Sequence, residues 1–297
     1  MLSQALSNHQ SGLMDQAILV YRQVLAVQPD FADANHLLGI ALHHRGELEE
    51  AVGLIKKAIK SVPGRAAFHS NLGNALKDVG RMDEAVASFR KALVMDPEYA
   101  NAHINLGNVL NQLGRYDESG PHLQKAIRLQ PDSPEAHNNL GLMLHEGQHQ
   151  LNEAVSSFNK ALSLRPDFPE AHYNLGNVLS EQFCLDDAVV SFQKALSLRP
   201  GYTVAHINLG NAFKEQNKLE EAVRSYRKAI EIDPDKAELH SNLGSTLKEQ
   251  GNLIGAVASF KKAIAIWPEY ADAYYNLGNV IHEQGDVDGA FEQLDLA

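Results

Sequence analysis

The sequence predicts an all-α fold, a solenoid of antiparallel helix pairs that extends along all 297 residues. Three observations predict it. Prolines recur at intervals of 34, 34, 34, 35, 34, 34 and 34 residues. A Leu-Gly pair recurs in step with the prolines, and an alanine follows most of its glycines by twelve residues. A fixed period of this length is typical of helical repeat arrays, in which each unit packs mainly on its neighbours.

Each repeat is expected to contain a helix, a tight turn, a second helix and a proline turn. The repeat glycine allows the two helices of a pair to approach closely. A second glycine, such as Gly46 or Gly80, marks the turn, because it tolerates a left-handed backbone. The proline ends the second helix. Nine units follow, at about residues 1–31, 32–65, 66–99, 100–133, 134–168, 169–202, 203–236, 237–270 and 271–297, as a single array.

This spacing of Leu-Gly, Ala, an aromatic residue, Ala and Pro resembles the tetratricopeptide repeat. The resemblance covers the whole chain and implies a right-handed superhelix of helix pairs. Its first helices would line the concave side.

Three departures from the repeat are expected to matter locally. Residues 147–150 are predicted to hold the single extra residue, in a turn between helices. Phe183 and Asn217 stand where other repeats have the turn glycine. Ser119 replaces the alanine of the helix contact, and Pro121 removes a backbone hydrogen bond, which predicts a weak second helix there.

Composition narrows the function. The net charge of -11 argues against nucleic acid and anionic membranes as partners, and favours a basic or polar protein segment. One cysteine, Cys184, excludes an internal disulfide. We expect no signal peptide at Met1–Ala5 and no membrane span. The expected location is therefore the cytoplasm, with the nucleus as the alternative.

Asparagine recurs around the repeat glycine and is the main candidate for binding. Two such positions lie three residues apart and share one face of the first helix. An amide both donates and accepts, so a ladder of amides can match the backbone of an extended peptide. The alternative is that these amides bond within the solenoid and tie neighbouring first helices together. The predicted peptide-binding residues are Asn71, Asn74, Asn105, Asn108, Asn139, Asn174, Asn177, Asn208, Asn211, Asn242, Asn276 and Asn279.

The ladder resembles the superhelical repeat region of O-linked N-acetylglucosamine transferases, which grip substrate peptides with asparagine at the matching place. That resemblance gives the alternative function, the substrate-recognition region of such an enzyme with its catalytic domain outside this chain. No sugar-transfer residue is implied here. A repeat clamp for a terminal carboxylate needs basic residues where this chain has Glu135, Glu170, Glu238 and Asp272, so we reject that function.

Histidine also recurs, four residues before the repeat glycine, at His69, His103, His137, His172, His206 and His240. Equivalent residues of adjacent repeats should lie about 10 Å apart, too far to share one zinc ion. We therefore predict a packing role, no metal and no cofactor. The row of lysines on the second helices is interpreted as a solvated face.

No catalytic motif interrupts the repeat, so we predict a non-catalytic chain. Its function is predicted to be a scaffold that binds an extended peptide or protein segment in an asparagine-lined groove. We also expect weak homodimerisation through apolar faces at residues 2–5 and 291–294, because terminal repeats normally need a polar outer face.

Overall fold

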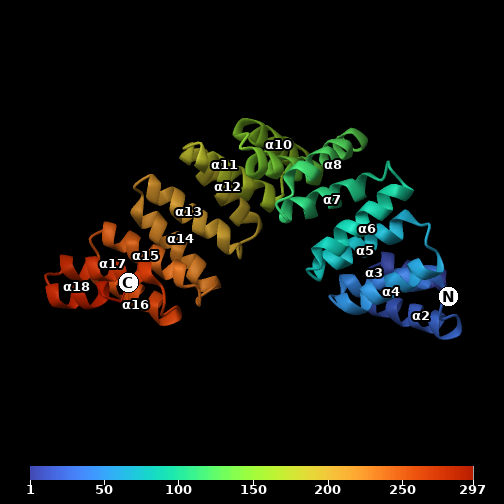
Figure 1. The fold of residues 1–297 in the computed structure, drawn as a ribbon, viewed down its shortest axis with the longest axis horizontal. Helices are drawn as coiled ribbons and strands as arrows, with labels where there is room; N and C mark the ends of the chain where they lie inside the picture. The colour runs from blue at the N-terminus through green and yellow to red at the C-terminus, as the bar shows by residue number, and fades with distance from the viewer. Residues whose placement is uncertain (297) are drawn as a thin grey trace. The chain divides into compact units, whose positions relative to one another are not determined.

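The computed structural model describes residues 1–296, and within them the chain has eighteen α-helices, one π-helical turn and no strand. It divides into two compact units, Met1–Gln150 and Leu151–Ala297 (Figure 1). Unit 1 contains α1 (Leu2–Gln10), α2 (Met14–Val27), α3 (Ala32–His44), α4 (Leu48–Ser61), α5 (Ala66–Asp78), α6 (Met82–Met95), α7 (Ala100–Gln112), α8 (Tyr116–Leu129), α9 (Pro134–Leu142) and the π-helical turn η1 (Met143–Gly147). Unit 2 contains α10 (Leu151–Leu164), α11 (Pro169–Glu181), α12 (Leu185–Leu198), α13 (Thr203–Glu215), α14 (Leu219–Ile232), α15 (Ala237–Glu249), α16 (Leu253–Ile266), α17 (Ala271–Glu283) and α18 (Val287–Leu294).

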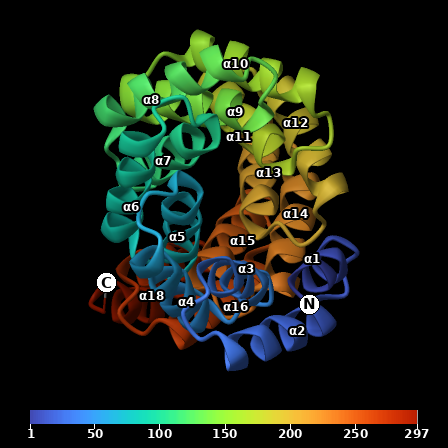
Figure 2. The ribbon, with the colours of Figure 1, turned by 90° about the vertical axis from the view of Figure 1, so that its right-hand side faces the viewer.

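Consecutive helices pack as pairs, and each pair packs on the next one within its unit. In unit 1 the first helices α5 and α7 lie on one side, and the second helices α6 and α8 lie on the other (Figure 2). First helices of successive pairs also contact each other, as α3 does α5 and α11 does α13. The predicted fold class, an all-α solenoid of helix pairs, is confirmed. That all nine repeats form one continuous array stays a prediction.

The repeat glycine is where the two helices of a pair touch. A Cβ atom on Gly73 would lie 2.7 Å from the ring of Phe89, a contact that real Cβ atoms do not make. Phe89 is fully buried and packs in one cluster with Leu106 and Val109 of the following repeat. One aromatic side chain therefore joins the two helices of its own pair to the next pair.

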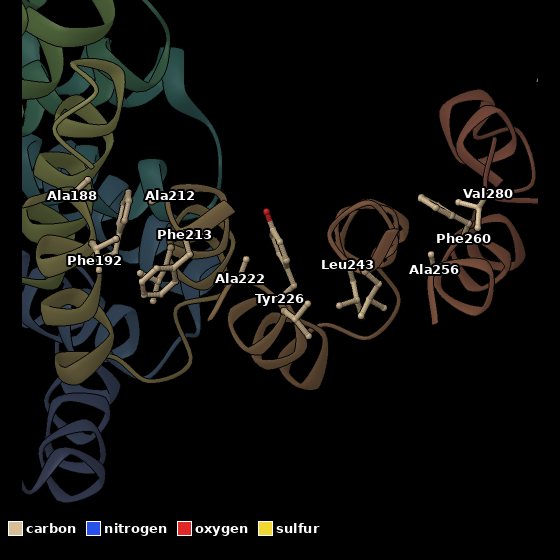
Figure 3. Close-up of a cluster of buried hydrophobic side chains, with 14 of the residues drawn as sticks. Ala188, Phe192, Ala212, Phe213, Ala222, Tyr226, Leu243, Ala256, Phe260 and Val280 are labelled. Atoms are coloured by element: carbon tan, nitrogen blue, oxygen red, sulfur yellow. The ribbon is translucent and has the colours of Figure 1, made fainter. Parts of the chain in front are cut away.

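The same arrangement recurs in unit 2. The rings of Phe192, Tyr226 and Phe260 come from α12, α14 and α16 and lie in one buried cluster (Figure 3). Each ring packs on the glycine of its own first helix, with hypothetical Cβ contacts of 2.6 to 2.9 Å. The aromatic ring can take its place only because the residue sixteen positions earlier is glycine. In these pairs the two residues therefore depend on each other.

The first helix of each pair ends at a residue with positive φ. Gly46 has φ 86°, and glycine takes this conformation in most turns. Phe183 and Asn217 adopt it as well, with φ of 59° and 58°. The sequence prediction that these two residues replace the turn glycine is confirmed.

The extra residue of the longer repeat lies elsewhere than predicted. The chain absorbs it in η1, Met143–Gly147, which continues α9 with wider i→i+5 bonding, so the placement in a turn at 147–150 is wrong. A one-residue insertion into a helix generally produces such a π-helical turn. His149, with φ 53°, then takes the place of the turn glycine.

Two residues of α8 depart from the repeat, Ser119 and Pro121. The helix is continuous from Tyr116 to Leu129 with Pro121 inside it. Ser119 is completely buried, and its hydroxyl donates a 2.9 Å hydrogen bond to the carbonyl of Gly107. Ser119 therefore fits between α7 and α8 where other repeats have alanine, and its hydroxyl is hydrogen-bonded there. A locally weak second helix at Pro121 stays a prediction.

The two ends of the chain differ. Ala5 is fully buried, and Leu2 packs against the same cluster, which also contains Ala17 and Tyr21, so the predicted open apolar face at residues 2–5 is wrong. At the other end, Phe291 of α18 is 63% exposed. Among the described residues, no helix is long and apolar enough to cross a membrane.

We predict that Phe291 promotes weak self-association, because it is a large apolar side chain exposed on a terminal helix. Light scattering over a concentration series should show a mass that rises above 32.6 kDa for the natural chain and stays constant for Phe291→Glu. A constant monomer mass for the natural chain would contradict this prediction.

We also predict that Phe183→Gly stabilises unit 2. The Phe183 side chain is 82% exposed, so little burial is lost, and glycine removes a left-handed strain of about 1 kcal/mol. Denaturant unfolding should show a free energy of unfolding that is higher by roughly 0.5 to 1 kcal/mol. This figure allows for the conformational entropy that glycine adds to the unfolded chain, which offsets part of the relieved strain. Asn217→Gly is the matched control and should have a smaller effect, since Asn tolerates this conformation. A lower midpoint for Phe183→Gly would show that the ring makes a stabilising contact.

Candidate functional site

The predicted asparagines all lie on the first helices, around the repeat glycine. In unit 1 they come from α5, α7 and α9, and in unit 2 from α11, α13, α15 and α17. Most are partly buried. Asn139 is 5% exposed, whereas Asn211 is exposed to solvent. The amides therefore lie at the boundary between the core and the solvent.

Amide pairs join neighbouring first helices. The Asn105 Nδ2 atom donates to Asn74 Oδ1 at 3.0 Å. At the next junction the direction is reversed, and Asn108 Nδ2 donates to Asn139 Oδ1 at 3.3 Å. In unit 2, Asn208 Nδ2 donates to Asn177 Oδ1 at 2.8 Å. The alternative role considered from the sequence, tying first helices together, is thus present at these three junctions.

Other polar side chains extend these pairs, and the sequence analysis missed them. Asn71 Nδ2 lies 2.9 Å from His36 Nε2, and Asn208 Nδ2 also donates to the Tyr173 hydroxyl at 3.3 Å. His36 and Tyr173 occupy the same repeat position, three residues before the glycine. A polar aromatic residue at that position was the signal that could have identified them.

Tyr226 changes the pattern in unit 2. Its hydroxyl donates a 2.6 Å bond to Asn211 Oδ1, whereas the neighbouring repeats of unit 2 have Phe192 and Phe260 at this position and no hydroxyl. Burial raises the pKa of the Tyr226 phenol, so it remains a donor.

Three amides of the ladder stand apart. Asn242, Asn276 and Asn279 are partly buried, and their side chains make no hydrogen bond to any described residue. They retain two donors and an acceptor each. They are the asparagines of the ladder with the most hydrogen-bonding capacity left for another molecule.

A pocket of about 660 Å³ opens beside the amides of unit 1. Asn71, Asn74 and Asn105 line it, together with residues 130–135 of the following turn. A second pocket of about 310 Å³ shares the same three asparagines and extends to Ile40 and His43 of α3. The paired amides therefore border two pockets beside the first helices α3, α5 and α7.

Charge in the larger pocket is negative. Its lining contains Asp132 and Glu135 and no lysine or arginine. Of the acidic residues that argued against a carboxylate clamp, Glu170 forms an ion pair with Arg199, and the hydroxyl of Ser133 donates to Glu135 at 3.1 Å. A partner segment that enters this pocket meets amides, hydroxyls and carboxylates.

The histidine row has a structural role. Each Nε2–H donates to the carbonyl of the proline six residues earlier, at 2.8 to 3.1 Å, and Asn35 does the same to Pro29 at 2.9 Å. These bonds satisfy an acceptor in the turn before each first helix. The bonded residues are His69, His103, His137, His172, His206 and His240. Within residues 1–296, no group of three or more His, Cys, Asp or Glu side chains is placed to hold a metal ion.

Burial lowers the pKa of His36 to about 4, while Asp33 opposes the shift and Arg65 adds to it. His36 stacks on Phe68 with ring centroids 4.1 Å apart. Its Nε2 accepts the amide hydrogen of Asn71 and must be unprotonated to do so. In unit 1 the Asn71 amide therefore depends on His36 Nε2 as its acceptor, and protonation of His36 would remove that hydrogen bond.

Models of tetratricopeptide repeats match most of the chain. Two models described as "Tetratricopeptide repeat" match residues 2–66, 70–134 and 169–202, a third matches residues 122–156, and one described as "TPR repeat" matches 148–182, 210–251 and 244–285. The chain is a tetratricopeptide repeat protein. Arrays of tetratricopeptide repeats are typically non-catalytic and act as scaffolds for protein interactions.

A comparison with solved structures gives a chain of similar fold over most of the array. The APC/C hetero-tetramer Cut9-Hcn1 contains a chain that matches 90% of this tetratricopeptide array with a TM-score of 0.70 and 20% sequence identity. The match spans only 52% of that chain. YrrB, described as a TPR protein with an unusual peptide-binding site, is 29% identical over 61% of this chain and 93% of its own, with a TM-score of 0.47. Comparison with curated proteins gave no match.

We predict that stability falls between pH 6.5 and 4. The folded pKa of His36 lies below its unfolded value of 6.5, so the unfolded chain binds more protons in this window and acid favours unfolding. His36→Tyr should flatten the fall, since Tyr173 shows that a hydroxyl at this repeat position accepts from the matching asparagine. The expected reduction in slope is roughly 1 kcal/mol per pH unit near pH 5.

Denaturant unfolding at several pH values measures this slope. His36→Tyr and the natural chain should be equally stable, within about 1 kcal/mol, above pH 7. A parallel pH dependence for the two proteins would show that His36 is not the titrating group. Other histidines with lowered pKa, such as His122, should leave a residual slope in the variant.

Proposed function

We propose that this tetratricopeptide array binds an extended segment of a partner protein along the first-helix face, with asparagine amides bonding to the partner backbone. The observation that carries the proposal is the 660 Å³ pocket lined by Asn71, Asn74 and Asn105. A bond between two amides uses one donor and one acceptor. Asn74 therefore keeps both N–H donors, and Asn105 keeps its oxygen and one donor, beside open space.

The paired and unpaired amides take different parts in this proposal. The paired ones fix the spacing of neighbouring first helices and offer their remaining donors and acceptors. Asn242, Asn276 and Asn279 make no bond that a partner would have to compete with. They should contribute affinity without contributing stability.

The substrate-recognition region of a glycosyltransferase, with its catalytic domain in another part of the protein, is the alternative. The asparagine ladder favours it over other tetratricopeptide subfamilies. Cross-linked partner segments that are rich in serine and threonine would support this alternative, and segments without hydroxyl side chains would argue against it.

We predict that Asn242→Ala with Asn276→Ala and Asn279→Ala weakens partner binding at least tenfold and leaves the melting temperature unchanged. A lost hydrogen bond costs about 1 kcal/mol, and three of them exceed the 1.4 kcal/mol of a tenfold change. The probe is a fluorescent peptide selected by display from a random 15-residue library against the natural chain. Fluorescence anisotropy measures its affinity for each variant.

Two further variants give the controls. Asn74→Ala with Asn105→Ala removes a paired bond and should lower stability by about 1 kcal/mol as well as binding. Asn159→Ala, on the exposed surface of the second helix α10, should change neither. If the triple variant and Asn74→Ala with Asn105→Ala both bind the peptide as tightly as the natural chain, the first-helix amides do not hold the partner.

A further inference from the structure

Ion pairs link successive second helices of unit 1 at a fixed repeat position. Arg22 of α2 lies 3.1 Å from Glu50 of α4, and Lys56 of α4 lies 3.5 Å from Glu84 of α6. Arg90 of α6 pairs in the same way with Glu118 of α8. The basic residue is always the ninth of its helix and the acidic residue the third of the next.

A second link runs in the opposite direction at two of these junctions, α4 with α6 and α6 with α8. Arg81, just before α6, lies 3.9 Å from Glu49 of α4, and Arg115, just before α8, lies 3.6 Å from Asp83 of α6. Arg81 also holds Glu84 through two hydrogen bonds of 2.6 and 2.7 Å.

The repeats that contain α6 and α8 therefore present an Arg-x-x-Glu sequence to the second helix before them. In unit 1 these are Arg81 with Glu84, and Arg115 with Glu118. The arginine neutralises an acidic residue of the earlier helix, and the glutamate neutralises a basic one. The two charges together complete the junction.

The junction between α14 and α16 in unit 2 lacks both partners. Asn252 and Gly255 occupy the positions of the arginine and the glutamate. Glu220 and Arg227 of α14 are the residues that they should neutralise, and neither makes an ion pair with any described residue. Both are exposed. They lie seven residues apart, on one helix face and roughly 10 Å from each other along the axis.

A pocket of about 710 Å³ lies at this junction. Glu220, Arg227, Gln250 and Asn252 line it, with Val223 among its apolar residues. Unit 1 has a comparable pocket of about 540 Å³ at residues 46–50, so the space itself belongs to the fold. What distinguishes the α14 pocket is an unneutralised acidic residue and an unneutralised basic residue on the same wall.

Neighbouring charges of the pocket are already satisfied. Lys218 lies 3.9 Å from Asp186, and Arg224 lies 3.3 Å from Glu221. A simple anion would neutralise Arg227 and be repelled by Glu220, and a simple cation would have the reverse problem. The ligand that fits both residues carries a basic and an acidic group. Their spacing is that of Arg81 and Glu84, which lie three residues apart on one helix.

We propose that this pocket binds a helical segment of a partner protein that begins with a basic residue, two intervening residues and an acidic residue. The basic side chain pairs with Glu220, and the acidic side chain pairs with the guanidinium of Arg227. The two charged residues that hold the partner both lie on the second helix α14, and the pocket contains none of the asparagines of the first-helix ladder. Its partner supplies, from outside the chain, the same two charges that Arg81 and Glu84 supply within it.

The test uses a fluorescent synthetic peptide with the sequence of residues 80–95, which begins Gly-Arg-Met-Asp-Glu, and a control peptide with Arg81 and Glu84 exchanged. Anisotropy at low ionic strength should show that the first peptide binds the full chain about fivefold more tightly, since exposed pairs are weak and screened by salt. Absence of saturable binding of the first peptide, or equal affinity for both, would overturn the proposal.

Two variants of the chain identify the site. Asn252→Arg with Gly255→Glu supplies the missing charges in the chain itself and should lower the affinity about fivefold without lowering the melting temperature. A Cβ on Gly255 would meet only the Asn252 side chain, at 3.0 to 3.1 Å, and that side chain is replaced in the same variant. Unchanged affinity in this variant would place the peptide elsewhere.

The charge-exchanged variant Glu220→Arg with Arg227→Glu should prefer the control peptide, which no general loss of folding can imitate. If it keeps the preference of the natural chain, the proposed pairing is wrong. The triple variant Asn242→Ala, Asn276→Ala, Asn279→Ala should bind the first peptide normally. The charge variants therefore test this pocket, and the asparagine variants test the first-helix face, so either proposal can fail without the other.

Discussion

The close approach of the two helices at the repeat glycine is the constraint on which the other features depend. A Cβ on Gly107 would lie 2.5 Å from Leu123, and one on Gly210 would lie 2.8 Å from Tyr226. Because this contact fixes the rotation of each first helix, it also fixes the side on which residues two before and one after the glycine emerge. Neighbouring repeats share that rotation, so their asparagines meet at 2.8 to 3.3 Å. The same contact orients the residue four before the glycine toward the preceding proline carbonyl.

Much of the fold could be predicted from the sequence, because residues that recur at a fixed interval occupy equivalent places in a repeating backbone. The helix pairs, the turns at positive φ and the face that carries the amides were all predicted. The partners of the amides were not, since they depend on side chains from another repeat, as when His36 accepts from Asn71. The histidine bonds could have been found from the sequence. A constant six-residue separation from proline places each imidazole over a carbonyl that the first helix leaves unbonded.

The extra residue shows where such reasoning stops. Two anchored positions, Gly141 and the positive-φ residue His149, are one residue further apart than their counterparts. Any segment between them could accommodate the insertion. A surface turn is the general expectation, but the turn here keeps its geometry and α9 widens into η1 instead. Gly147 explains part of this choice, because a Cβ there would lie 2.5 Å from Tyr116, so the widened helix packs closely on α8. That contact between repeats is invisible in the local sequence.

Function in a repeat array is best sought where the repeats stop completing one another. Residues that obey the period are accounted for by the packing, as the histidines and the paired amides show. Asn242 has no amide partner, and the Asn211 oxygen that the register would offer it accepts from the Tyr226 hydroxyl instead. Glu220 and Arg227 have no charge partners, because Asn252 and Gly255 replace the arginine and glutamate of other junctions. Both departures fall on consecutive repeats of unit 2 and on different helices, so the same part of the array leaves hydrogen bonds open on its first helices and charges open on its second helices. A partner that bonds to the open amides and also neutralises Glu220 and Arg227 would be recognised by hydrogen bonds on one face and by ion pairs on the other. The two recognitions are independent, because they use different residues on different helices.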